Sequence, residues 1–134
     1  MGAAALVASG IAVVAAGPAS AGADGCLGTQ VYAQNVYGQG AYSGKIVAIV
    51  YGYWDGSANC EVAVKQVLVG QRTYMSLSLF SSVGKPDNDA GDFLYYAGPT
   101  NVDGIGSCVW EQVVVDDAHG GVIAQYNSPP HNCG

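Results

Sequence analysis

The amino-acid sequence predicts an all-β protein, an antiparallel sandwich or barrel of about six to eight strands with two disulfides. Short runs rich in β-branched and aromatic residues alternate with Gly, Pro, Asn and Asp clusters at intervals of about 8–12 residues. No stretch after the first 23 residues combines helical periodicity with capping residues. Four cysteines on a chain that begins like an exported protein indicate the disulfides.

The expected strands are residues 27–37, 45–54, 60–69, 73–80 and 93–97, followed by a closing hairpin over 106–134. The segment 45–54 is apolar at successive positions, which is typical of a central strand covered on both faces. In 73–80, apolar and serine residues alternate, which predicts a half-exposed strand. Because proline cannot donate to a ladder, Gly98-Pro99 either ends its strand or places it at an edge.

The final hairpin is predicted from its central Gly120-Gly121 pair, since two-residue hairpin turns favour residues that accept positive φ. A fold-back at that pair sets Cys108 opposite Cys133 and His131 opposite Trp110. Pro129-Pro130 cannot pair as donors, so regular pairing should stop near Ser128. Cys133 would then return to Cys108 along an irregular tail.

Residues 1–23 resemble a secretory signal peptide, because they carry no charged side chain and contain a short Ala/Val/Ile/Leu run. Cleavage is expected after Ala21 or Ala23, where small residues occupy the required positions. The usual basic start is missing at Met1-Gly2, which suggests a start codon further upstream. A membrane span needs about 20 apolar residues, so no transmembrane anchor is expected. Residues 24–134 then form a single β domain.

The net charge of −6 argues against nucleic acid or an anionic lipid surface as partner, since both select clusters of Lys and Arg. The four basic residues are scattered along the chain. Low charge together with many Gly and Tyr residues suits an extracellular β-protein, and the apolar content is too high for a disordered tail.

Four cysteines allow three connectivities. Pairing of Cys26 with Cys60 and of Cys108 with Cys133 is favoured, because each bond then closes a local loop. A metal site built on the cysteines is disfavoured, since no two of them have the C-x-x-C spacing.

Few residues suggest chemistry. Asp87, Asp89 and Asp92 lie in the polar segment 85–92, which only loosely resembles a calcium loop and lacks its bidentate glutamate, so a surface turn is the simpler prediction. His119 and His131 have no serine in a nucleophile elbow to activate. They are interpreted as a turn residue and a structural residue.

Glycosidases need two carboxylates, and Glu61 and Glu111 are the only glutamates. Nothing in the sequence places these two residues together. We therefore predict no catalytic residues, no cofactor and no metal, and we expect that the protein is not an enzyme.

Aromatic residues are the best functional indication from composition. Tyrosine has an apolar face and a polar tip, so a Tyr/Trp surface could stack on sugars of a cell-wall or spore-surface polysaccharide. The simpler interpretation is that tyrosine is a favoured strand residue. The candidate surface-binding residues are Tyr51, Tyr53, Trp54, Tyr95, Tyr96 and Trp110.

Short motifs in residues 59–134 resemble the spore-associated protein A family, which are small secreted proteins of actinomycetes. The motifs are TYMSL at 73–77, YYAGP at 95–99, GSCV at 106–109, YNSP at 126–129 and HNCG at 131–134. The sequence departs from the family after GSCV. The family pattern has a basic residue before the tryptophan and glycines after it, whereas here Trp110 and Glu111 follow directly. The resemblance implies an exported protein of the spore or aerial surface and brings no catalytic residues.

The leading hypothesis is therefore a secreted, disulfide-bonded β-domain associated with the cell or spore surface, with a structural or interaction role. One alternative is a glycan-binding module that uses the Tyr/Trp face. Another is a secreted enzyme inhibitor, for which segment 85–92 is the best candidate loop. The oligomeric state cannot be derived from the sequence.

Overall fold

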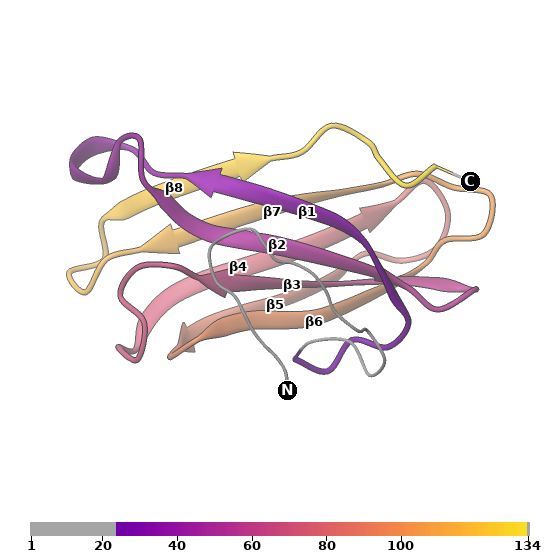
Figure 1. The fold of residues 1–134 in the computed structure, drawn as a ribbon, viewed down its shortest axis with the longest axis horizontal. Coiled ribbons are helices and arrows are strands. Elements are labelled where there is room, and N and C mark those ends of the chain that lie inside the picture. Colours follow the sequence, from indigo (N-terminus) through magenta and orange to yellow (C-terminus); the bar gives the residue numbers. More distant parts are fainter. Residues whose placement is uncertain (1–23, 134) are drawn as a thin grey trace.

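The computed structural model describes residues 24–133, so the predicted signal segment 1–23 and its cleavage site lie outside the described residues. Eight strands form two antiparallel four-stranded sheets, which confirms the predicted fold class (Figure 1). The first sheet has the order β1-β2-β3-β6 and the second β5-β4-β7-β8. The strands are β1 Thr29–Tyr37, β2 Ile46–Trp54, β3 Ala58–Lys65, β4 Thr73–Ser81, β5 Asp87–Phe93, β6 Tyr96–Asp103, β7 Val109–Asp116 and β8 Val122–Asn127.

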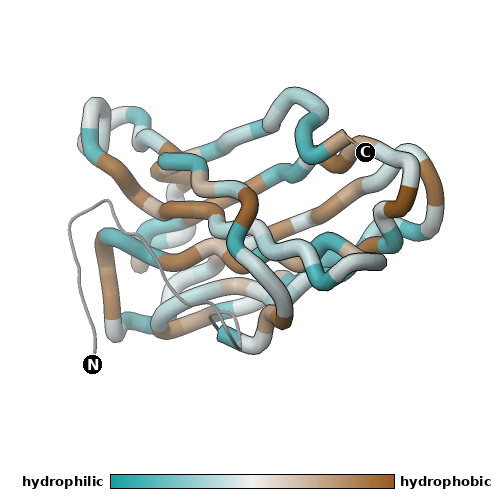
Figure 2. The backbone as a smooth tube through the Cα atoms, turned by 45° about the vertical axis from the view of Figure 1, so that its right-hand side comes forward, coloured by the Kyte–Doolittle hydropathy of each residue, from teal (hydrophilic) through white to brown (hydrophobic). Residues whose placement is uncertain are grey.

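The core lies between the two sheets and is built by alternation along the strands, as the hydropathy colouring in Figure 2 illustrates. In β4, Met75, Leu77 and Leu79 are fully buried, which agrees with the predicted half-exposed strand. These residues share the interior with small and β-branched residues of the other sheet, such as Val50 and Ala63. Burial of such apolar surface is the main term that stabilises the sandwich.

Strand β2 occupies a central position in its sheet and is covered on both faces, as its apolar run predicts. One face contributes to the main core. The opposite face forms a second buried cluster, in which Tyr53 and Val62 pack with the Cys26–Cys60 disulfide. Cys26, which precedes β1, is therefore anchored on the outer face of the first sheet.

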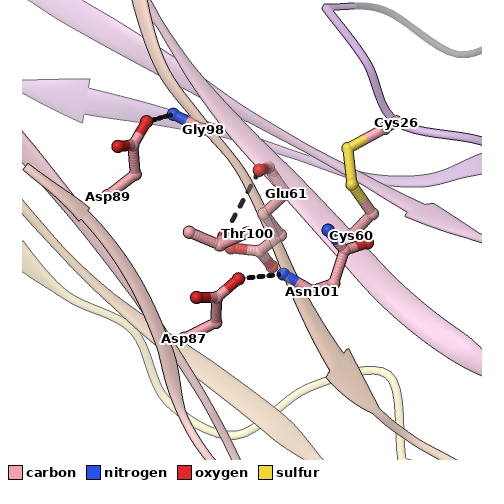
Figure 3. The surroundings of a disulfide bond; sticks show 8 residues. All are labelled: Cys26, Cys60, Glu61, Asp87, Asp89, Gly98, Thr100 and Asn101. Carbon is pink, nitrogen blue, oxygen red and sulfur yellow. Dashed lines mark hydrogen bonds between the residues drawn. A yellow bond between two sulfur atoms is a disulfide. The ribbon is translucent and has the colours of Figure 1, made fainter.

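The acidic segment 85–92 is not the predicted surface turn, because most of it belongs to strand β5. Asp87 accepts a hydrogen bond from the backbone N–H of Asn101 at 2.9 Å, and Asp89 accepts one from Gly98 at 2.8 Å (Figure 3). Both donors lie on β6, so these carboxylates join the edges of the two sheets. A rigid exposed inhibitor loop is therefore absent from this position.

The predicted strand 93–97 is also wrong, because the chain turns at Leu94-Tyr95 between β5 and β6. Strand β6 then continues through Pro99 to Asp103. It lies at the edge of its sheet, where a proline needs no ladder partner, as expected from Gly98-Pro99. The pairing register with β3 shifts between Glu61 and Ala63, close to this proline.

Strand β3 ends at Lys65, earlier than the predicted boundary at residue 69. The Lys65 side chain is buried and donates to Gln71 O, Thr73 Oγ1 and Phe93 O. Burial lowers its pKa, and three acceptors satisfy its three N–H donors. Lys65 thereby holds the loop after β3 against the start of β4 and the end of β5.

The final hairpin turns through Asp117–Gly121 and not through a two-residue Gly-Gly turn. The Asp117 carboxylate accepts backbone hydrogen bonds from His119 at 2.8 Å and Gly121 at 2.9 Å, which stabilises the wider loop. The register consequently differs from the predicted one. His131 pairs with Val109, not with Trp110.

The C-terminal tail otherwise follows the prediction. Regular pairing stops at Asn127, and Cys133 returns to Cys108 as a disulfide beyond the two prolines. Both predicted disulfides are therefore confirmed. Within residues 24–133, no helix is long and apolar enough to cross a membrane.

Candidate functional site

Four polar side chains meet inside the sandwich. Tyr32 comes from β1, Glu61 from β3 and Glu111 from β7, while His131 comes from the C-terminal tail. The glutamates are 1% and 0% exposed, respectively. Both sheets and the tail contribute, so the cluster exists only in the folded chain.

Glu111 is the centre of the hydrogen bonding in this cluster. Its Oε1 atom lies 2.6 Å from His131 Nε2, and its Oε2 atom accepts a bond from the Tyr32 hydroxyl at 2.7 Å. The Tyr32 and His131 rings stack with centroids 3.7 Å apart and planes 9° from parallel. Both contacts and the stacking fix the tail against the first sheet.

Glu61 is the least satisfied member of the cluster. It lies near His131, whose Nε2 is 3.6 Å from Glu61 Oε2. Neither carboxyl oxygen has a hydrogen-bond partner in the described part of the chain, and the same holds for His131 Nδ1. Burial raises the pKa of Glu61 well above its usual range, and the nearby Glu111 carboxylate raises it further.

Gly52 creates the space in which Tyr32 and Glu61 approach each other. It pairs with both residues in the ladders of β2. A Cβ at position 52 would lie 2.9 Å from Tyr32 Cβ and 3.6 Å from Glu61 Oε2. A side chain here would push Tyr32 aside, so the missing Cβ is part of the site.

The pKa of the Tyr32 hydroxyl is raised, first by burial and then by the hydrogen bond to Glu111. Tyr32 therefore acts as a donor in this cluster. The two carboxyl groups are enclosed by the sandwich, so a polysaccharide cannot reach both of them as a glycosidase mechanism requires. The chemistry open to them is proton sharing or coordination of a small cation.

A surface cavity of about 260 Å³ lies beside the tail. Asn59 is 1% exposed, and neither its amide nitrogen nor its oxygen has a partner among residues 24–133. Asn59 and Glu61 lie two positions apart on β3 and so face the same side of the sheet. The cavity is lined by Val31, Trp54, Asn59, Gly104, Asn132 and Cys133.

The predicted aromatic surface is divided among several places. Tyr53 is 4% exposed and packs in the outer cluster of the first sheet, so it is not a surface residue as predicted. Tyr51 packs against the same cluster. The remaining rings lie apart, with Trp54 at the cavity beside the tail, Tyr95 and Tyr96 at a second cavity near the β5–β6 turn, and Trp110 stacked on Phe80.

The other candidate residues lie outside the buried cluster. His119 is exposed in the β7–β8 turn. Asp92 is exposed on β5, while Asp87 and Asp89 bond to β6. Asp87 and Asp89 thus face one side of β5 and Asp92 the other, so the three aspartates do not form a calcium loop.

One feature of the sequence indicates that Glu111 is buried. On β7, Glu111 occupies an inward position between Val109 and Val113, both fully buried. A charged residue within an inward apolar series is unusual, because burial of an unpaired charge is costly. The pairing with Glu61 could not be read from this signal, since the two glutamates lie on different sheets.

Together, the fold and the site define a disulfide-bonded all-β domain with a buried Glu-Glu-His-Tyr cluster. No family model, curated protein or solved structure matches the chain.

Proposed function

We propose that the protein is an exported, non-catalytic binding domain of the cell or spore surface, and that it binds a glycan at the cavity beside the C-terminal tail. Two disulfides in a domain of this size suit an oxidising, extracellular setting. The resemblance to spore-associated protein A motifs supplies the surface setting of the proposal.

The observation that carries glycan binding is the combination of Trp54 and Asn59 in one cavity. A tryptophan ring can stack on the apolar face of a sugar. The Asn59 carboxamide offers both a donor and an acceptor that have no partner in the described structure, and sugar hydroxyls would satisfy both. Asn132, from the tethered tail, adds a second amide to the lining.

The absence of catalysis is supported by the enclosure of the carboxylate pair. Glu61 and Glu111 do not line the cavity, and none of the residues that line it is acidic. A sugar held by Trp54 and Asn59 would therefore meet amides and an indole ring. Such groups bind and orient a sugar but supply no general acid or base.

Binding can be measured with tryptophan fluorescence, because Trp54 and Trp110 are the only tryptophans. The Trp110→Phe variant leaves Trp54 as the sole reporter, and titration with soluble fragments of chitin, cellulose and peptidoglycan should give saturable quenching with at least one of them. Asn59→Ala in this background should weaken binding by about tenfold, since a buried hydrogen-bonding group is lost.

The matched control is Tyr95→Ala, which alters an exposed aromatic at the second cavity and should leave the affinity unchanged. No quenching with any fragment, together with no retention on the three insoluble polymers, would contradict glycan binding. The surface setting is tested separately by fractionation of the producing culture into cytoplasm, medium, cell wall and spores. Protein found only in the cytoplasm would refute it.

A further inference from the structure

We propose that Glu61, Glu111 and His131 form a binding site for one divalent transition-metal ion, with zinc as the preferred ion. This site is separate from the proposed glycan cavity and does not depend on it. The three potential ligand atoms lie within 4.8 Å of one another and come from both sheets and from the tail.

The distances fit a metal with small adjustments. Two ligand atoms that are each about 2.0–2.1 Å from a tetrahedral zinc lie about 3.3–3.4 Å apart. His131 Nε2 and Glu61 Oε2 are 3.6 Å apart, which is close to this value. His131 Nε2 and Glu111 Oε1 are 2.6 Å apart, so this hydrogen bond would open by less than about 1 Å and be replaced by two metal bonds.

The second observation is the unsatisfied Glu61 carboxyl group. Its side chain is 1% exposed and points into the cluster, and neither oxygen has a hydrogen-bond partner in the part of the chain that the structure describes. Two buried carboxylates are costly unless a cation compensates them. A divalent ion would neutralise both glutamates and give Glu61 the partner that it lacks.

Neighbouring groups hold two of the three ligands, Glu111 and His131, in position. The Tyr32 hydroxyl donates to Glu111 Oε2 at 2.7 Å, so the other oxygen, Oε1, which faces His131 Nε2, is the one that would coordinate the ion. Such outer hydrogen bonds orient ligating carboxylates. His131 is held by backbone bonds to Val109 on one side and by stacking on Tyr32 on the other. Its side chain is 15% exposed and provides the route by which an ion enters.

The donor set selects the metal. Calcium and magnesium prefer sites made of oxygen atoms alone, whereas an imidazole with carboxylates suits zinc and its transition-metal neighbours. Three protein ligands leave a fourth zinc position for water.

The test uses the folded protein after treatment with a chelator, titrated with zinc chloride by calorimetry and followed by NMR. One zinc per chain should bind, and the melting temperature should rise, because the ion binds the native state only. The chain contains two histidines, so the His131 ring signals should shift while those of His119 stay in place. Calcium should produce neither effect.

Glu61→Gln keeps the size of the side chain and should weaken zinc binding at least tenfold, whereas His119→Ala is the matched control and should bind like the wild type. If Glu61→Gln does not fold, His131→Gln tests the same site from the tail. The proposal is overturned if zinc leaves the His131 signals unchanged, or if the glutamine variants bind zinc as tightly as the wild type.

Discussion

Glu61 shows how a single residue departs from the ordinary rules of burial. It lies on the inward face of β3, where Ala63 two positions on contributes to the core. Its carboxyl group lies beside His131 and Glu111, and burial and the Glu111 carboxylate raise its pKa. The charge state of this residue should therefore affect stability.

We expect the stability of the metal-free protein to fall as the pH rises above the ordinary glutamate pKa of about 4.3. The pKa of Glu61 is raised in the folded protein, so the native state holds the proton more tightly than the unfolded chain does. The free energy of unfolding then decreases with pH by up to about 1.4 kcal/mol per pH unit between the unfolded and folded pKa values.

Glu61→Gln should remove this dependence, because an amide does not titrate. The measurement is urea unfolding of both proteins at a series of pH values in the presence of a chelator. The difference between the wild-type and variant curves isolates Glu61 from the other acids. Parallel curves over the whole range would show that Glu61 ionises in the native state as easily as in the unfolded chain.

At the scale of elements, strands β5 and β6 show how the sandwich closes one of its sides. The carboxylates of Asp87 and Asp89 accept backbone N–H groups of β6, which belongs to the other sheet. On the opposite side, the Gln39 N–H donates to Ile123 O at 2.8 Å and joins the loop after β1 to β8. Edge strands protected in this way are less available for aggregation.

Asp89→Ala should lower the free energy of unfolding by about 1–2 kcal/mol, because the N–H of Gly98 loses a charged acceptor. Asp92→Ala is the control on the same strand, since Asp92 is exposed and should change stability by less than about 0.5 kcal/mol. Chemical denaturation of both variants measures the difference. Equal effects would mean that the side-chain bridges between the sheets do not stabilise the fold.

For the whole molecule, the Cys108–Cys133 disulfide connects the covalent framework to the buried cluster. It fixes the tail that carries His131, two residues before Cys133. The Cys26–Cys60 disulfide instead holds the segment before β1 on the outer face of the first sheet. The two bonds close loops of similar size but constrain different parts of the molecule.

Replacement of Cys108 and Cys133 by alanine should therefore lower the free energy of unfolding by about 3.5 kcal/mol, the value for a loop of this length in the chain-entropy model. It should also shift the His131 ring signals in NMR, because the tail is released from Tyr32. The matched variant without Cys26 and Cys60 should lose similar stability but leave these ring signals unchanged. Unchanged His131 signals in the tail variant would show that the cluster holds the tail without the disulfide.

Much of this architecture follows from local sequence. Alternation along residues 73–80, the apolar run at 45–54 and the glycine-rich turns predict the strands because side chains in a strand face opposite sides in turn. The two local disulfides follow from the cysteine positions. The polar segment 85–92 misled this reasoning, since its carboxylates satisfy backbone donors on a neighbouring strand that the sequence does not reveal.

The sequence by itself thus determined the fold class, the number of disulfides and the end of regular pairing at the prolines. Only the tertiary structure decided which side of the sheet His131 faces, because a shift of one residue in the register moves a side chain to the other face. The Asp117 turn, the register shift between Val115 and Asp116 and the irregular chain after Asn127 together place His131 opposite Val109 and beside Glu111. The packing of two sheets then adds Glu61, which no local pattern connects to them.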